Sequence, residues 1–283
     1  MMLYMFKIQR IDVNNENAKH DFFTSFQNTG FAVMENHGIS FELIDKVYEE
    51  WKQFFNSKDK YNYKFNTDKQ DGFFPFRSES AKDNPIKDLK EFFHVYPNSN
   101  LPNYLSSNTR LLYTQLTNLG NMLLGWLDEL TPENIQELFS ESLFNMVKGS
   151  DRNLLRVLHY PPIEEKIEKG AIRAAAHEDI NLITLLVSGS QPGLEAMDKD
   201  GKWHKVPVDK GMITVNVGDM LQMASGGYFP STSHRVVNPE SSTQNVSRFS
   251  LPMFMHPRNE VILKPGTTAH DYLQERLKEI NLK

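Results

Sequence analysis

The part of the chain after Asn153 restricts the possible folds most, because it consists of short apolar segments separated by turn residues. Pairs such as Pro161-Pro162 and Asp200-Gly201 punctuate most of the gaps between these segments. Many short strands at this spacing are typical of a β-sandwich or barrel, such as a jelly roll. The expected strands cover 154–160, 180–187, 193–197, 212–217, 220–224, 234–237 and 248–255.

The part before Asn153 is expected to be mainly helical, with short strands near 6–13, 31–34 and 90–96. Leucines recur at intervals of three and four in one long stretch, which indicates an amphipathic helix. Ser40 is a candidate N-cap, and Thr131-Pro132-Glu133 combines a cap, a proline and an acid at a helix start. The predicted helices cover 17–29, 40–55, 108–128, 131–146 and 268–280.

These patterns predict a single domain of the α+β class over 1–283. The chain has 283 residues, of which 39% are hydrophobic, so it is long enough to bury a substantial core. It contains no internal repeat, low-complexity run or linker that would divide it. We expect a mainly helical region over 1–150, followed by a β core with the functional site and the C-terminal helix over 151–283.

Composition excludes several classes of protein. The chain has 31 Lys and Arg residues against 36 Asp and Glu residues, a net charge of −5, which argues against nucleic acid or an anionic membrane as the main partner. It has no cysteine, so disulfides, thiolate ligands and catalytic thiols are excluded. No apolar run is long enough to span a bilayer, and the N-terminus does not resemble a signal peptide. We therefore expect a cytoplasmic protein; the sequence is silent on oligomeric state.

A candidate metal site begins at His177-Glu178-Asp179. If this segment is extended, His177 and Asp179 lie on the same face, and His234 on a distant strand can complete the set. His-x-Asp alone is a weak signal in a chain with nine histidines. Two imidazoles and one carboxylate, with open positions left over, are the ligands that suit non-haem Fe(II) in oxygen-activating enzymes.

A candidate carboxylate-binding pair follows in Ser247-Arg248-Phe249-Ser250. In an extended strand Arg248 and Ser250 face the same way. A guanidinium forms a bidentate, charge-assisted pair with a carboxylate, and a neighbouring hydroxyl adds a further donor. The alternative is that Arg248 forms a structural ion pair with one of the 36 acids of the chain.

Taken in order, these motifs make the chain resemble the isopenicillin N synthase-like family of Fe(II)/2-oxoglutarate-dependent dioxygenases. The resemblance covers nearly the whole chain, and the ordered set is far more specific than any single motif. In the N-terminal region it includes Asn36-His37-Gly38-Ile39 and the segment 88–93. The matching C-terminal segments are 155–162, His177-Glu178-Asp179, 200–203, 215–219, 233–239 and Arg248-Phe249-Ser250.

The resemblance implies a double-stranded β-helix (jelly roll) core flanked by helices, with His177, Asp179 and His234 as ligands of Fe(II). It also implies an enzyme that uses 2-oxoglutarate and O2 to oxidise a small molecule, usually by hydroxylation, and releases succinate and CO2. Desaturation and ring closure remain open as outcomes, and the sequence does not name the primary substrate. We expect segment 72–77 and the C-terminal helix to determine specificity.

For the cosubstrate, the resemblance implies that Arg248 and Ser250 hold the distal carboxylate of 2-oxoglutarate and that the Tyr160 hydroxyl is a further contact. The chain departs from the pattern at Leu158, where many plant members have asparagine. Any polar contact from that position is therefore absent, which puts binding at this end of the site in doubt.

Three alternatives remain open from the sequence. Relatives of this kind include oxidases that use iron without 2-oxoglutarate, such as the aminocyclopropane-carboxylate oxidases and isopenicillin N synthase, and they can keep the Arg-x-Ser pair for another carboxylate. A non-catalytic jelly-roll module could keep a metal for structure, although a structural site normally fills its coordination from the protein. A zinc hydrolase with the same three ligands would leave Arg248 without a role.

Overall fold

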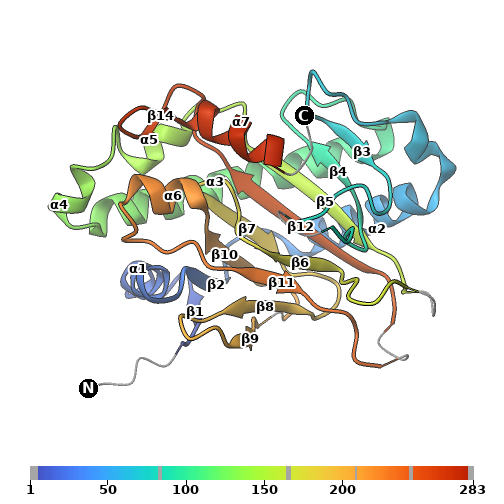
Figure 1. The fold of residues 1–283 in the computed structure, drawn as a ribbon, viewed down its shortest axis with the longest axis horizontal. Coiled ribbons are helices and arrows are strands. Elements are labelled where there is room, and N and C mark those ends of the chain that lie inside the picture. The colour runs from blue at the N-terminus through green and yellow to red at the C-terminus, as the bar shows by residue number, and fades with distance from the viewer. Residues whose placement is uncertain (1–5, 82–84, 164–166, 208, 242–244, 280–283) are drawn as a thin grey trace.

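A large sheet forms the centre of the computed structural model, which describes residues 6–81, 85–163, 167–207, 209–241 and 245–279 (Figure 1). Within these residues the sheet has eight strands, with β1 and β2 parallel and the other neighbours antiparallel. Across the sheet, the order is β1 (Gln9–Asp12), β2 (Phe31–Glu35), β10 (Ile213–Val217), β7 (Ile183–Val187), β12 (Arg248–Met255), β5 (Leu154–Tyr160), β4 (Glu91–Val95) and β3 (Gly72–Phe74). The N-terminal strands thus extend both edges of the sheet that the C-terminal half forms.

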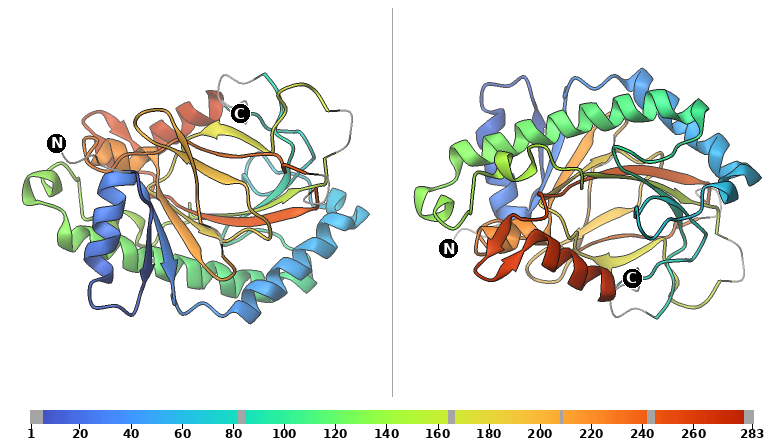
Figure 2. Two further views of the ribbon diagram at one scale, coloured as in Figure 1. Left: turned by 90° about the horizontal axis from the view of Figure 1, so that it is seen from below. Right: turned by 90° about the horizontal axis from the view of Figure 1, so that it is seen from above.

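A second, smaller sheet packs against one face of the large one (Figure 2). Apolar side chains from both sheets, such as Phe92 and Leu158 from the large one and Leu194 and Ala196 from the small one, share one buried cluster. Two sheets of short antiparallel strands around such an interior form the predicted jelly roll. The small sheet has the order β6 (Ala174–His177), β11 (His234–Val236), β8 (Leu194–Met197) and β9 (Trp203–Lys205).

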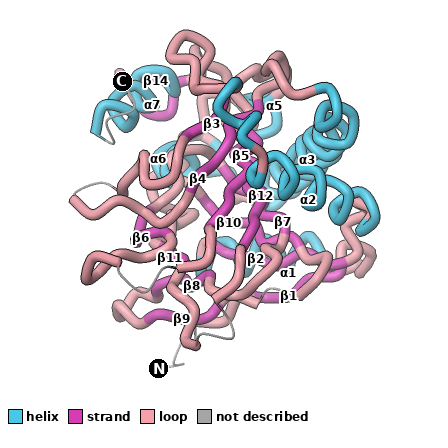
Figure 3. The backbone as a smooth tube through the Cα atoms, turned by 90° about the vertical axis from the view of Figure 1, so that its right-hand side faces the viewer, coloured by secondary structure: helices cyan, strands magenta, loops and turns pink. Residues whose placement is uncertain are grey.

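Helices cover the opposite face of the large sheet (Figure 3). The helices α1 (Ala18–Thr29), α2 (Phe41–Asn56) and α3 (Asn103–Leu130) supply apolar side chains to the larger core cluster, including Trp51 and Leu116, which share it with Leu185 and Met253 of the sheet. Gly120 lets α3 approach β12 closely, because a methyl group there would lie 2.9 Å from the sulfur of Met255. The helices therefore pack against one face of the large sheet, and its other face lines the interior between the two sheets.

The helices predicted over 17–29, 40–55 and 108–128 are confirmed as α1, α2 and α3. Gly30 ends α1 with a φ of 68°, and the Ser40 side chain accepts a hydrogen bond from the main-chain N–H of Leu43 at the start of α2. The prediction of one helix over 131–146 was wrong, because the segment forms the short helices α4 (Glu133–Gln136) and α5 (Leu143–Val147). The Asp128 carboxylate accepts the N–H groups of residues 143 and 144, and it thereby starts a new helix after a turn.

In the second half, the predictions for β5 and β12 are confirmed to the residue. The expected strand at 220–224 was wrong, because this segment is the helix α6 (Asp219–Ala224), which buries Met220, Leu221 and Ala224 on one face. The sequence reading missed β6, β9 and the hairpin of β13 (Ile262–Lys264) and β14 (Thr267–Thr268). The last helix, α7 (Ala269–Glu279), matches the predicted one, whose end at Ile280 lies outside the described residues.

One short 3-10 helix, η1 (Lys58–Asn62), follows α2. Within the described ranges, no helix combines the length and the apolar character that crossing a bilayer requires.

Candidate functional site

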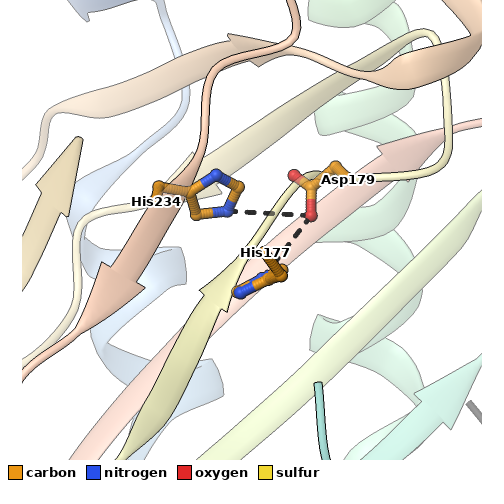
Figure 4. A group of neighbouring side chains, drawn as sticks. All are labelled: His177, Asp179 and His234. Carbon is orange, nitrogen blue, oxygen red and sulfur yellow. Dashed lines mark ion pairs between the residues drawn. The ribbon is translucent and has the colours of Figure 1, made fainter. Parts of the chain in front are cut away.

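His177, Asp179 and His234 come together in the space between the two sheets (Figure 4). One potential ligand atom from each lies within 4.8 Å of the other two. His177 ends β6 and His234 begins β11, and the two residues are directly opposite each other in the antiparallel pair. Among the described residues this is the one cluster of His, Cys, Asp or Glu side chains with the geometry to hold a metal ion.

The prediction that His177 and Asp179 share one strand was wrong. Strand β6 stops at His177, and Asp179 lies in the loop that leads to β7. The start of α6 holds this loop in place, because the main-chain N–H of Asp219 donates a 2.7 Å hydrogen bond to the Asp179 carbonyl. Gly218 permits this approach, since a methyl group there would lie 2.2 Å from the carbonyl oxygen of Asn181. The loop, and not strand alternation, brings the carboxylate to the histidines.

Both imidazoles present Nε2 to the centre of the cluster. His177 Nδ1 lies 2.7 Å from the Ala175 carbonyl, and His234 Nδ1 lies 3.1 Å from the Thr232 carbonyl. A carbonyl only accepts, so each Nδ1 carries the proton and each Nε2 keeps a free lone pair, as a metal ligand must. The Nε2 atoms of His177 and His234 lie 3.9 and 3.8 Å from Asp179 Oδ1.

The Asp179 carboxylate is oriented by two neighbouring strands of the large sheet. Its Oδ2 accepts the Thr184 hydroxyl of β7 at 2.6 Å and the Asn216 side-chain amide of β10 at 2.8 Å. These bonds occupy one carboxylate oxygen and leave Oδ1 for the histidine side. The sequence analysis gave neither residue a role at the site, although both lie within expected strands, 180–187 and 212–217.

Electrostatics keep His177 and Asp179 in the forms that bind a metal. Burial, followed by the charge of His234, lowers the pKa of His177 to about 4, so this imidazole is neutral at pH 7. Burial alone would raise the pKa of Asp179, but His234, His177 and the two hydrogen-bond donors outweigh it and lower that pKa. Neutral imidazoles and an ionised carboxylate are the protonation states that bind a metal. Two nitrogens and one oxygen, with no fourth His or acid among the described residues, fit Fe(II) with open coordination positions.

Arg248 and Ser250 face the same cavity as the three candidate ligands. Arg248 Nε donates to the Gln191 carbonyl at 3.0 Å, and Nη1 donates to the Ser250 hydroxyl at 3.3 Å. Its Nη2 is buried without an acceptor, and no carboxylate in the described part of the chain pairs with this guanidinium. The alternative of a structural ion pair is therefore wrong for the described residues. Tyr160 is opposite Arg248 in the β5–β12 pair, with its ring 5.1 Å from the guanidinium carbon.

One cavity of about 470 Å³ connects these groups and continues along the inner face of the large sheet. Alternate residues of β5 and β12 line it, as strand geometry requires. Leu158 is among them, at the end near Tyr160. Away from Tyr160, the lining includes the polar side chains of His94, Arg156 and His256.

The two segments expected to determine specificity differ in their relation to the cavity. Leu273, Gln274 and Leu277 of α7 line the cavity, as expected for the C-terminal helix. Segment 72–77 does not contribute to the lining, although Gln70 and Glu79 on either side of it do. The reason is that 72–74 forms strand β3, whose residues are buried in the sheet.

Two further histidines have structural partners. His37 Nε2 lies 2.7 Å from the Gly211 carbonyl, so it is bound to the main chain and not to a metal. His94 Nδ1 lies 3.1 Å from the Gln70 carbonyl, while its Nε2 accepts a 2.9 Å hydrogen bond from Arg156.

The chain is similar to known proteins over most of its length. A sequence profile described as the 2OG-Fe(II) oxygenase superfamily matches residues 152–257, and one described as non-haem dioxygenase in morphine synthesis N-terminal matches residues 7–114. The first range contains all six residues predicted for metal and cosubstrate.

Among characterised relatives, 1-aminocyclopropane-1-carboxylate oxidase 4 of Arabidopsis thaliana is 31% identical over 262 residues, covering 90% of this chain and 77% of the relative. Gibberellin 2-beta-dioxygenase 1 of the same plant is 29% identical over 290 residues, covering 95% and 84%. Among solved structures, a putative oxygenase from Shewanella oneidensis has a TM-score of 0.87 and 47% identity, with 96% of this chain and 98% of that chain covered.

Proposed function

Since the chain belongs to the Fe(II)- and 2-oxoglutarate-dependent oxygenase superfamily, we propose that His177, Asp179 and His234 are its iron ligands. Arg248 and Ser250 then bind the distal carboxylate of 2-oxoglutarate, and Tyr160 is a further contact. The protein is an Fe(II)/2-oxoglutarate-dependent dioxygenase that oxidises a small-molecule substrate. Iron, when bound, supplies O2 binding and the oxidative decarboxylation of 2-oxoglutarate to succinate and CO2.

The protein's own residues hold and orient the reactants. The Ala175 and Thr232 carbonyls fix the protons of His177 and His234 on Nδ1, so that both Nε2 atoms are available. The two donors on Asp179 Oδ2 set the carboxylate plane before any metal arrives. Such preorganisation reduces the cost of assembling the site.

One observation carries the cosubstrate assignment: Arg248 Nη2 is a buried N–H group without an acceptor, in the same cavity as the candidate ligands. A buried donor without a partner is costly, and a carboxylate is the group that relieves it best. This favours a ligand with a carboxylate at this end of the cavity, and the family match makes 2-oxoglutarate the proposed ligand. Leu158 offers no polar contact, so we assign the cosubstrate carboxylate to Arg248, Ser250 and Tyr160.

We propose that the primary substrate occupies the other end of the cavity, near Arg156 and His256. Arg156 is four residues from Tyr160 along β5, about 13 Å in an extended strand, which leaves room for a second molecule. Arg156 Nε is bound to His94 and Nη1 lies 3.3 Å from Glu79, while Nη2 has no acceptor among the described residues. Hydroxylation of a C–H bond is the proposed outcome.

We also propose that 1–283 is one oxygenase domain, since strands from both regions share the large sheet. The cytoplasm is the proposed location, because the site requires iron in its reduced state.

Anaerobic titration of the Fe(II)-loaded protein with 2-oxoglutarate tests the assignment of both sites. We expect a metal-to-ligand charge-transfer band in visible light that saturates with 2-oxoglutarate. Arg248→Met should raise the concentration needed for saturation, whereas His234→Ala should remove the band. If iron binds and the band is absent at all concentrations, the cosubstrate-independent oxidase becomes the better reading.

A further inference from the structure

Arg173 and Arg248 are among the largest side chains that are fully buried, with exposed fractions of 2% and 1%. No acidic side chain pairs with either guanidinium in the described part of the chain, and each has a buried N–H group without an acceptor, Nε in Arg173 and Nη2 in Arg248. This is unusual, since buried charges are normally paired. Lys90 in the same interior shows the normal case, with Glu79 at 2.7 Å and Asp88 at 2.9 Å.

The two arginines lie at the same end of the interior. Arg173 directly precedes β6, and its main-chain N–H donates to the Asn238 side chain at 3.0 Å. Its guanidinium reaches the segment that leads into β12, where Nη2 donates to the Val246 carbonyl at 2.8 Å, two residues before Arg248. Burial, followed by the charge of Arg248, lowers the pKa of Arg173, while Tyr160 raises it. The three side chains therefore interact electrostatically.

Two buried positive charges near Tyr160, unpaired among the described residues, repel each other. Such an arrangement lowers the stability of the empty protein and favours an anion that enters between or beside the charges. Arg173 does not line the cavity, so its effect on a bound molecule is exerted through space and through Arg248. The distal carboxylate of 2-oxoglutarate is the anion that the cavity admits at this end.

We propose that Arg173 is a positioning residue for 2-oxoglutarate, a second positive charge behind Arg248 that makes this end of the cavity selective for a carboxylate. The proposal rests on the proposed role of Arg248 and goes beyond it. It explains how the chain retains a strong carboxylate site although Leu158 offers no polar contact.

The test compares two ligands that differ in the distal group. 2-Oxoglutarate carries a carboxylate there, and 2-oxopentanoate carries a methyl group. Arg173→Gln removes the charge and keeps a donor for the Val246 carbonyl, whereas Arg173→Lys keeps the charge. Arg110→Gln is the matched control, because Arg110 also donates to backbone carbonyls, those of Pro97 and Ser99, but lies on α3 behind the sheet.

Dissociation constants for both ligands are measured anaerobically on the Fe(II) protein, together with the unfolding temperature of the metal-free protein with and without 2-oxoglutarate. We expect R173Q to weaken 2-oxoglutarate about tenfold, equivalent to roughly 1.4 kcal/mol, and to leave 2-oxopentanoate unchanged. R173K and R110Q should retain the wild-type preference. The stabilisation of metal-free protein by 2-oxoglutarate should shrink in R173Q alone.

The possible outcomes separate this inference from the proposed function. If R173Q discriminates between the ligands as the wild type does, Arg173 has no such role. If R173Q and R173K both weaken the two ligands equally, the role of Arg173 is structural and the inference is wrong. A wild-type protein that itself shows no preference for 2-oxoglutarate would contradict the role of Arg248, and this inference would fall with it.

Discussion

The side-chain amide of Asn216 donates a 2.8 Å hydrogen bond to Asp179 Oδ2, and this bond leaves Oδ1 to face the two histidines. Partners of this kind typically change metal affinity ten- to a hundredfold when removed. We therefore expect Asn216→Ala to weaken Fe(II) binding by about ten- to a hundredfold, measured by anaerobic titration.

Thr214→Val is the control for that variant. Thr214 is buried two residues earlier on β10, and its hydroxyl has no partner among the described residues. Iron binding should be unchanged in T214V. Wild-type iron affinity in N216A, or equal losses in both variants, would show that the hydrogen bond does not orient the carboxylate.

The Arg248 guanidinium packs against Gly189, where the absence of a side chain makes room for it. A methyl group at Gly189 would lie 2.9 Å from Nη2 and 3.1 Å from the guanidinium carbon. We expect Gly189→Ala to displace Arg248 and to raise the dissociation constant for 2-oxoglutarate about tenfold, a change of roughly 1.4 kcal/mol. Iron affinity should stay at the wild-type value.

Gly125→Ala serves as the matched glycine variant, because a methyl group at Gly125 in α3 meets no atom within 4 Å. It should leave 2-oxoglutarate binding unchanged and stabilise the helix by up to about 1 kcal/mol. Unaltered cosubstrate binding in G189A would mean that the position of Arg248 is not critical.

His256 makes the stability of the metal-free protein depend on pH. Burial lowers the pKa of this histidine from 6.5 to about 4 in the folded state. Between these pH values the unfolded chain binds a proton that the folded chain does not. The stability that depends on neutral His256 is therefore fully present above pH 6.5 and is lost as the pH falls toward 4. When the pH falls from 7.5 to 5.0, the proton linkage of His256 should lower the free energy of unfolding by about 2 kcal/mol.

Urea unfolding at the two pH values measures this loss. His256→Gln should reduce it by about 2 kcal/mol, whereas His20→Gln, at the exposed His20, should leave it as in the wild type. An equal loss in H256Q and the wild type would contradict the assignment of a neutral, buried imidazole.

The sequence predicted those parts of the fold that local patterns determine. The cap at Ser40, the leucine spacing in α3 and the apolar runs of β5 and β12 are local, and they matched the structure. The 220–224 segment was misread because a short apolar run fits a strand and a helix equally well. Only the packing of α6 against the loop after β6 decides between the two.

The site was predicted as a set of residues but not as a geometry. His177, Asp179 and His234 do converge, yet Asp179 arrives from a loop that contacts the start of α6, a tertiary relationship without a local signal. Thr184 and Asn216 were missed for the same reason, since their strands become neighbours only in the folded sheet. The proximity of Arg173 to Arg248 likewise depends on how the two sheets pack against each other.

The central claim is that three side chains on one loop and two strands hold an iron that couples 2-oxoglutarate to oxidation. Succinate release from 2-oxoglutarate by the purified protein, with Fe(II) and O2, tests it most directly. We expect succinate only when iron and 2-oxoglutarate are both present, and none from an Asp179→Ala variant that still unfolds cooperatively. A wild-type protein that binds iron through this site and releases no succinate, with or without a primary substrate, would contradict the account.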